Sequence, residues 1–147
     1  MVGIRLKAVI LSLFFISAAP RSKGRDEGMA VLEDWFMYPS KASGKEISSK
    51  GFDVSGWYRV KVPTTVFGGL IQNGIYKDPY SGKNLAEVEG FQDILWRTEE
   101  MPEDSPFRDP WWFRTSFTSR TGRAVLHLDG INYRAEVWLN GEKVADR

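Results

Sequence analysis

The segment at residues 134–145 constrains the fold more than any other part of the chain, because it has the pattern of a β-hairpin. Ala135, Val137 and Leu139 alternate with polar or aromatic residues, and a period of two is typical of a strand with one buried face. Asn140-Gly141 follows, a dipeptide that favours the two positive φ angles of a type I′ turn. The sequence therefore predicts that the chain turns back here and continues as an antiparallel strand.

Alternating apolar residues predict further strands. The predicted strands are residues 57–62, which Pro63 ends, residues 111–117, and residues 126–129 within an apolar stretch that begins at residue 124. Residues 31–38 are predicted as a short helix or a strand. A short helix is expected after Thr64 or Thr65, either of which is a suitable N-cap, and Gly74 is placed to end it.

Residues 75–110 form a long and mostly irregular segment, interrupted by several prolines. Loops of this length in a compact domain are usually functional or disordered. Disordered segments contain few aromatic residues, whereas this one contains Tyr76, Tyr80, Phe91, Trp96 and Phe107. We therefore predict a functional loop.

The first 19 residues have the features of a secretory signal peptide. Arg5 and Lys7 precede an apolar run at residues 8–16, and small residues follow it up to Ala19. The run is about half of the ~20 residues that a membrane-spanning helix requires. We therefore expect an exported protein, periplasmic or extracellular, with a signal peptide at residues 1–19, a linker at residues 20–30 and one domain at residues 31–147.

The charge and the residue types exclude several kinds of partner. Loss of Arg5 and Lys7 with the signal peptide lowers the basic count from 20 to 18, against 19 acidic residues, so neither nucleic acid nor a membrane surface is an expected partner. The chain has no cysteine, and His127 is its single histidine. A lone histidine is poor support for a metal site or a general base, so we expect no metal and no cofactor.

Three separated segments resemble the N-terminal domain of glycoside hydrolase family 2, and most closely its exo-β-D-glucosaminidase and β-mannosidase-like branch. They are PTTVFGGLIQNGIYKDPYSGKNL (63–85), MPEDSPFRDPWWFRTSF (101–117) and LDGINYRAEVWLNGEKVA (128–145). The resemblance implies an all-β fold, an antiparallel jelly-roll β-sandwich of the galactose-binding-like type. Because the chain ends just after the predicted hairpin, we expect this sandwich to be incomplete and the chain to be an N-terminal fragment.

The resemblance also implies the chemistry of the whole enzyme. In this family an immunoglobulin-like domain and a (β/α)₈ barrel follow the sandwich, and the barrel supplies both carboxylates of a retaining mechanism. We therefore assign no catalytic residue to this chain and expect it to hydrolyse nothing by itself. Its expected partners are the two downstream domains and, in the full-length enzyme, a terminal β-linked sugar.

The resemblance further implies that a loop of the first domain leans over the barrel mouth, where an asparagine touches the terminal sugar. Asn84 is the candidate for that contact, Tyr80 for stacking on a sugar face, and Asp78 is the third predicted substrate-binding residue. The alternative for Asn84 and Asp78 is a purely local role, in which they hydrogen-bond the backbone of a turn. Trp111 and Trp112 point to opposite faces of one strand, so we expect at most one of them in the core.

Two alternatives to the hydrolase hypothesis stay open. The chain is either a stand-alone sandwich that binds carbohydrate through an exposed aromatic platform, or a truncated product without a function of its own.

Overall fold

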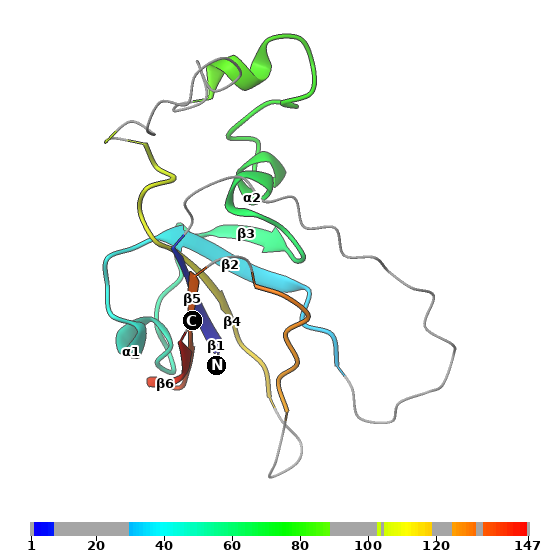
Figure 1. Ribbon diagram of the computed structural model, residues 1–147. Helices are drawn as coiled ribbons and strands as arrows, with labels where there is room; N and C mark the ends of the chain where they lie inside the picture. The colour runs from blue at the N-terminus through cyan, green and yellow to red at the C-terminus, as the bar shows by residue number, and fades with distance from the viewer. Residues whose placement is uncertain are drawn as a thin grey trace.

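The computed structural model describes residues 2–7, 30–88, 103, 105–118, 125–131 and 134–146. The strands are β1 (Val2–Lys7), β2 (Asp34–Pro39), β3 (Tyr58–Lys61), β4 (Trp111–Thr115), β5 (Arg134–Leu139) and β6 (Glu142–Asp146). They form one antiparallel sheet in the order β3-β2-β4-β1-β5-β6 (Figure 1). The helices are short: α1 (Gly44–Ile47), α2 (Val66–Gln72) and the 3-10 helix η1 (Asn84–Glu87). The predicted all-β, antiparallel fold is confirmed.

Helix α2 covers one face of the sheet, and the main core lies between them. The core side chains from the strands are those of Trp35, Met37, Val60, Trp111, Phe113 and Val137, and α2 adds Val66 and Leu70. Gly69 permits this close packing, because a Cβ atom there would lie 2.5 Å from the Met37 sulfur. Ala135 and Leu139 pack against the same core, so the face predicted for residues 135–139 is confirmed.

Both ends of α2 lie where the sequence predicts them. Thr65 is the N-cap, and its hydroxyl accepts a hydrogen bond of 3.0 Å from the Gly68 N–H. Gly74 ends the helix with a φ of 70°. Beyond this, Gln72 uses both ends of its amide on the outer edge of β3, accepting from the Lys61 N–H at 2.9 Å and donating to the Lys61 carbonyl at 3.2 Å. This closes an edge that would otherwise invite strand pairing.

The opposite face of the sheet is covered by residues 40–52, here named the α1 cover. Arg114 of β4 is only 3% exposed on this face, and it donates to the carbonyls of Ile47 at 2.8 Å and of Ser49 at 3.2 Å. Its burial lowers the pKa of the Arg114 guanidinium from the usual value. Gly44 lies against the indole of Trp138. This face of β4 is therefore an interior surface, whereas on β5 Arg134 is exposed and Trp138 is half-buried.

The prediction that at most one of Trp111 and Trp112 lies in the core is wrong. The two residues are 2% and 0% exposed. They do point to opposite faces, but the sheet is covered on both. Trp111 packs under α2 and donates from Nε1 to the Pro106 carbonyl, whereas Trp112 faces the α1 cover and donates to the Ser40 carbonyl at 3.2 Å.

The predicted hairpin is confirmed. Asn140 and Gly141 have φ angles of 50° and 90°, and Leu139 lies opposite Glu142 across the turn. The turn is also tied to the α1 cover, because the Gly141 N–H donates to the hydroxyl of Ser48 at 2.9 Å. Ser48 is fully buried and donates in turn to the Gly44 carbonyl at 2.7 Å.

The strand predicted at residues 126–129 is not formed. Residues 125–130 have no regular structure and are exposed. A strand needs a neighbour for its backbone groups, but β4 lies between β2 and β1, and β5 lies between β1 and β6. The central position belongs to Val2–Lys7, within the predicted signal peptide. Export stays a prediction.

Several predictions fall on residues outside the described ranges. These are the rest of the signal peptide, most of the linker at residues 20–30, and Phe91 and Trp96 of the long loop. In the part of the chain that is described, no helix is long and apolar enough to span a membrane.

Candidate functional site

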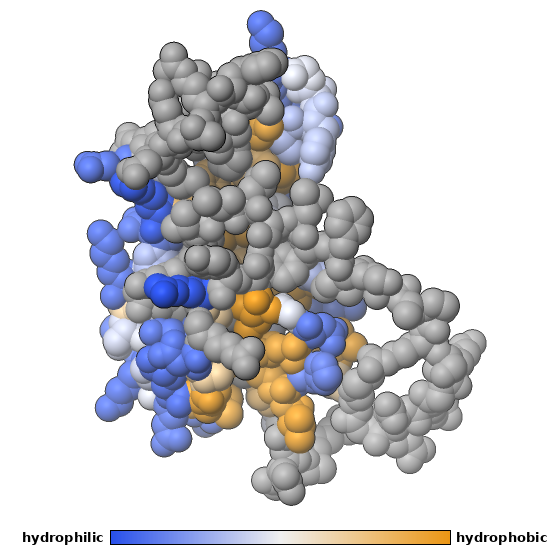
Figure 2. Space-filling view, in the orientation of Figure 1, coloured by the Kyte–Doolittle hydropathy of each residue, from blue (hydrophilic) through white to orange (hydrophobic). Residues whose placement is uncertain are grey.

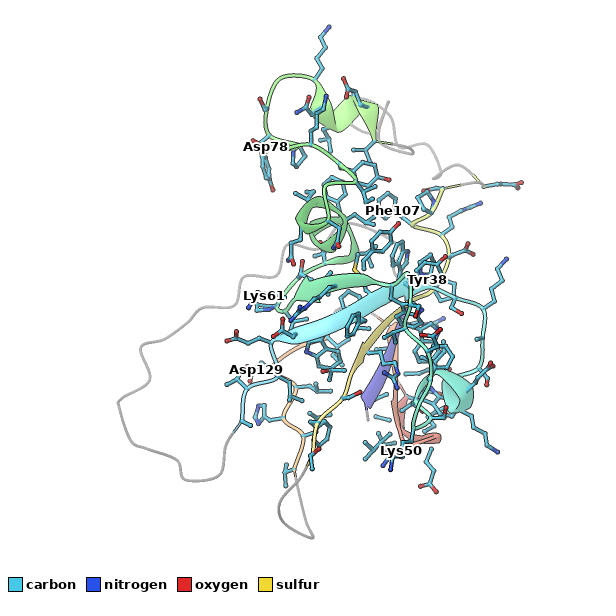
Figure 3. The ribbon with its side chains drawn as sticks, turned by 180° about the vertical axis from the view of Figure 1, so that it is seen from behind. Tyr38, Lys50, Lys61, Asp78, Phe107 and Asp129 are labelled. Carbon is cyan, nitrogen blue, oxygen red and sulfur yellow. The ribbon has the colours of Figure 1, made fainter. Side chains whose placement is uncertain are left out.

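The candidate site is the loop at residues 75–88, here named the site loop, which extends beyond α2 at one end of the molecule (Figure 3). It is anchored at both ends. The Ile75 N–H donates to the Leu70 carbonyl at 3.0 Å, and the ring of Tyr76 lies 5.5 Å from that of Phe67. At the other end Val88 is 2% exposed in the main core. The loop is therefore held on the domain, although most of its length is outside the core.

Two of the predicted site residues meet within this loop. The carboxylate of Asp78 accepts from the Tyr80 N–H at 3.0 Å, which closes a local turn. The Asp78 carbonyl accepts from the side-chain N–H of Asn84 at 2.8 Å. Asp78 and Asn84 thus have the turn-forming contacts that the alternative interpretation predicts, and their contact with a sugar stays a prediction.

Tyr80 has a different environment from its two neighbours. Its side chain is 90% exposed, and its ring is outside the cavity of the site loop. The backbone turn at Asp78 holds the residue in place while leaving the aromatic face in solvent. The position suits stacking against a flat apolar surface of a ligand or a neighbouring domain.

A cavity of about 220 Å³ opens beside Asn84. Its lining residues are Ile75, Tyr76, Lys77, Asn84, Glu87 and Val88. Asn84 is the one predicted site residue among them. An amide, an ammonium and a carboxylate around an apolar wall provide both donors and acceptors for hydroxyl groups. Sequence reasoning missed Lys77 and Glu87. The signal that could have found them is their position on either side of Asn84 in the same loop.

A larger hollow of about 420 Å³ lies at the edge of β3 and is lined by Asp34, Arg59, Val60, Lys61 and Gln72. Its polar groups already have partners. Arg59 pairs with Asp34 at 3.3 Å, and Gln72 bonds the backbone of Lys61. The hollow beside Asn84 is therefore the better candidate for a ligand.

The sequence and the fold were compared with those of known proteins. Residues 89–147 match the profile of the glycosyl hydrolase 2 galactose-binding domain-like family. An exo-β-D-glucosaminidase of Amycolatopsis orientalis is 34% identical over 135 residues, which cover 88% of this chain and 12% of that enzyme. The crystal structure of the exo-chitosanase CsxA of A. orientalis aligns with a TM-score of 0.56 and 30% identity, over 78% of this chain and 12% of that one. The chain is homologous to the galactose-binding-like N-terminal domain of family 2 glycosyl hydrolases.

Two further relatives are another exo-β-D-glucosaminidase and an endo-β-mannosidase. An exo-β-D-glucosaminidase of Arthroderma benhamiae is 32% identical over 124 residues, covering 80% of this chain and 13% of the enzyme. A mannosylglycoprotein endo-β-mannosidase of Lilium longiflorum is 37% identical over 90 residues, covering 59% of this chain and 8% of the enzyme. The family profile and the solved structure confirm the galactose-binding-like fold class. The chain spans only 8–13% of the length of the relatives named here.

The site loop lies inside the similarity to the A. orientalis enzyme, because an alignment over 88% of the chain includes residues 75–88. The candidate ligand groups of the domain lie on this loop. Among the described residues no cluster of three or more histidine, cysteine, aspartate or glutamate side chains has the geometry of a metal site. His127 lies 3.1 Å from Asp129 on an exposed segment.

Proposed function

We propose that this domain is the accessory N-terminal part of an exported glycoside hydrolase that removes terminal β-linked glucosamine or mannose residues. The observation that carries the proposal is its similarity to two exo-β-D-glucosaminidases, together with the cavity of about 220 Å³ beside Asn84. The carboxylates of the reaction belong to a barrel domain beyond an immunoglobulin-like domain. The pattern of residues 1–19 supports export.

In this proposal the site loop forms one wall of the terminal-sugar pocket. The hydrogen bond from Asn84 to the Asp78 carbonyl uses one amide N–H and orients the carboxamide. The Asn84 Oδ1 atom and the second N–H are the groups that would bind sugar hydroxyls. Because the loop is already folded by its own bonds, little conformational entropy is lost when the sugar binds.

The test is the Asn84→Ala substitution in the full-length enzyme. Loss of a neutral hydrogen bond worth about 1–2 kcal/mol lowers kcat/KM by roughly 5–30-fold. Ser81→Ala is the matched control, because Ser81 belongs to the same loop but does not line the cavity. An Asn84→Ala enzyme with unchanged kcat/KM and unchanged stability would remove the site loop from the substrate pocket.

The exposure of Tyr80 favours one alternative, a domain that binds carbohydrate without the barrel. An aromatic ring that is 90% exposed on an ordered turn is a suitable platform for a sugar face. Titration of the chain itself with chitosan oligosaccharides, followed by tyrosine and tryptophan fluorescence, separates the two hypotheses. Saturable binding that Tyr80→Ala abolishes supports the stand-alone binder, and no binding by the chain alone supports the accessory role.

A further inference from the structure

The dipeptide Asn-Gly occurs twice in the chain, at residues 73–74 and 140–141. Asparagine before glycine is prone to deamidation, because glycine has no Cβ atom to hinder its backbone nitrogen. That nitrogen loses its proton to water and bonds to the asparagine Cγ atom, the Cγ–Nδ2 bond breaks, and ammonia leaves. Water then opens the resulting succinimide ring at either of its carbonyls, which gives an aspartyl or an isoaspartyl residue. The structure holds the two dipeptides in different ways.

The first dipeptide ends α2 and is held by main-chain groups. The Asn73 Nδ2 atom, which would leave as ammonia, donates to the Gly69 carbonyl at 2.8 Å and to the Arg59 carbonyl at 3.0 Å. The Gly74 N–H, whose nitrogen would attack, donates to the Ile71 carbonyl at 2.9 Å. Release of these nitrogens requires loss of the last turn of α2, so Asn73 should keep its amide while α2 is folded.

The second dipeptide is the turn between β5 and β6, and a side chain of the α1 cover holds it. The Gly141 N–H donates to the Ser48 hydroxyl at 2.9 Å, across 93 positions of the sequence. Ser48 donates its own proton to the Gly44 carbonyl at 2.7 Å, so its oxygen faces Gly141 as an acceptor. Cyclisation rotates the Gly141 nitrogen toward the Asn140 side chain, and the bond to Ser48 opposes that rotation. Opening of the α1 cover would therefore free the attacking nitrogen.

Solvent reaches the turn on the side away from the α1 cover. Asn140 is exposed, and the reaction needs water both as a base and as a reactant. The surface over α1 and β6 is largely hydrophilic at the lower left of Figure 2, where Figure 1 shows these elements. Gly141 lies against α1, because a Cβ atom there would be 3.5 Å from the Lys45 carbonyl oxygen. Asn140 is thus accessible to water, whereas the nitrogen that attacks it faces the cover.

Deamidation would also prevent the original contact from forming again. Both products place a new carboxylate close to Glu142. An isoaspartyl residue adds a methylene group to the backbone of a turn that has room for two residues, since Leu139 pairs directly with Glu142. The added length moves Gly141 away from Ser48, so a single opening of the α1 cover becomes permanent.

We propose that Asn140-Gly141 is a deamidation site that the α1 cover keeps closed. In the closed domain Ser48 holds the Gly141 nitrogen away from the Asn140 carboxamide. Release of the cover lets the nitrogen attack, and Asn140 is converted to aspartate or isoaspartate. The product therefore marks the chains in which the α1 cover has opened.

The test compares the two dipeptides within the same molecules. The full chain and its Ser48→Ala variant are incubated at mildly alkaline pH, and peptide mass spectrometry follows the conversion of Asn73 and Asn140 to aspartate and isoaspartate. We expect Asn140 to react about tenfold faster in Ser48→Ala than in the unaltered chain, since loss of one hydrogen bond changes the population of the released nitrogen by about this factor. The rate at Asn73 should be unchanged.

A second variant separates release of the turn from a general loss of stability. Val66→Ala leaves a cavity under α2, on the face of the sheet away from the α1 cover. It is compared with Ser48→Ala at an equal free energy of unfolding, which is set with urea. The proposal is overturned if both variants deamidate at Asn140 equally fast, if Ser48→Ala leaves this rate unchanged, or if the rate at Asn73 rises equally.

The unaltered chain provides the same test if Ser48→Ala does not fold. Urea is raised in steps that stay below the unfolding transition, and both rates are measured at each step. Opening of the α1 cover should accelerate the reaction at Asn140 before the reaction at Asn73, because local opening precedes global unfolding. Equal acceleration at the two sites would overturn the proposal.

Discussion

The α1 cover and the site loop are both irregular segments that follow a strand or a helix, but they are held in different ways. The α1 cover is bound by hydrogen bonds between residues far apart in sequence: Arg114 to Ile47 spans 67 positions and Gly141 to Ser48 spans 93. The side-chain bonds of Asp78 in the site loop span 2 positions to Tyr80 and 6 to Asn84. In Figure 3 Lys50 of the cover and Asp78 of the loop mark opposite ends of the molecule.

This difference gives the two regions different roles, since the α1 cover stabilises the fold and the site loop keeps polar groups available for a ligand. A segment whose polar side chains are buried and bonded across the sheet contributes to the free energy of unfolding, and its loss leaves unsatisfied groups in the interior. A loop that is folded by its own short-range bonds contributes little to global stability and keeps its remaining donors and acceptors for a ligand. Substitutions that disturb the α1 cover should therefore lower the stability strongly, and one in the site loop should lower it little. Four substitutions test this, and a fifth experiment concerns the hairpin of β5 and β6.

Arg114→Ala should have the largest effect. It leaves the Ile47 and Ser49 carbonyls without their guanidinium donor under the α1 cover, and it removes a side chain that is 3% exposed. We expect a loss of about 3 kcal/mol in the free energy of unfolding, measured by urea denaturation. Arg114→Lys keeps the charge but not the fork of donors and should recover less than half of the loss. A loss below about 0.5 kcal/mol for Arg114→Ala would show that the cover is held by other contacts.

Gly44→Ala should come next. A Cβ atom at this position would overlap the indole of Trp138, so the indole or α1 must move. Overpacking of this kind costs about 2 kcal/mol. The matched control is a double-mutant cycle with Trp138→Ala, which removes the obstacle. If Gly44→Ala is equally destabilising in both backgrounds, the contact with Trp138 does not cause the loss.

Ser48→Ala should cost about 1–2 kcal/mol, because it removes a fully buried hydroxyl and leaves the half-buried Gly141 N–H without its acceptor. Ser55→Ala is the matched control. The Ser55 hydroxyl also makes a short hydrogen bond, 2.6 Å to Asp53, but that bond is exposed. We expect thermal unfolding to show a clear drop in Tm for Ser48→Ala and a much smaller one for Ser55→Ala. Equal drops would contradict the role of burial.

Asn84→Ala should lower the stability by only about 0.5 kcal/mol, because its bond to Asp78 is local and exposed. Urea denaturation of the chain measures this effect separately from the kcat/KM of the full-length enzyme. A loss as large as that of Arg114→Ala would abolish the distinction between the two regions. The site loop would then be part of the folded core.

The smallest effect concerns the hairpin at alkaline pH. Hydrogen bonds to Asp146 and Glu136 raise the pKa of Lys143 above its usual value. A raised pKa in the folded state means that Lys143 stabilises the hairpin below its unfolded pKa, near 10.4, and that this contribution disappears as the pH rises through the folded pKa. The stability difference between the chain and Lys143→Met should shrink as the pH passes from 9 to above 11. A difference that is constant over this range would contradict the ion pairs.

Local signals predicted the elements that depend on a few neighbouring residues. Asn140-Gly141 predicted the turn between β5 and β6, and Thr65 and Gly74 predicted both ends of α2. Helix α1 was missed although Ser43 and Glu46 have the spacing of a capping box, and the Ser43 hydroxyl does accept from the Glu46 N–H. In the site, Asn84 was predicted, but its cavity with Lys77 and Glu87 was not.

The amino-acid sequence by itself determined the hairpin and α2, because periodicity, turn dipeptides and caps act over a few residues. The resemblance of three segments to family 2 glycosyl hydrolases implied the all-β class. Only the tertiary structure decided that both Trp111 and Trp112 are buried, because that depends on the α1 cover reaching the second face of the sheet. It also decided which segment holds the place between β4 and β5. The sequence predicted a strand at residues 126–129, but Val2–Lys7 holds that place, and strand preference alone does not decide this because a strand forms only where a neighbouring strand pairs with it.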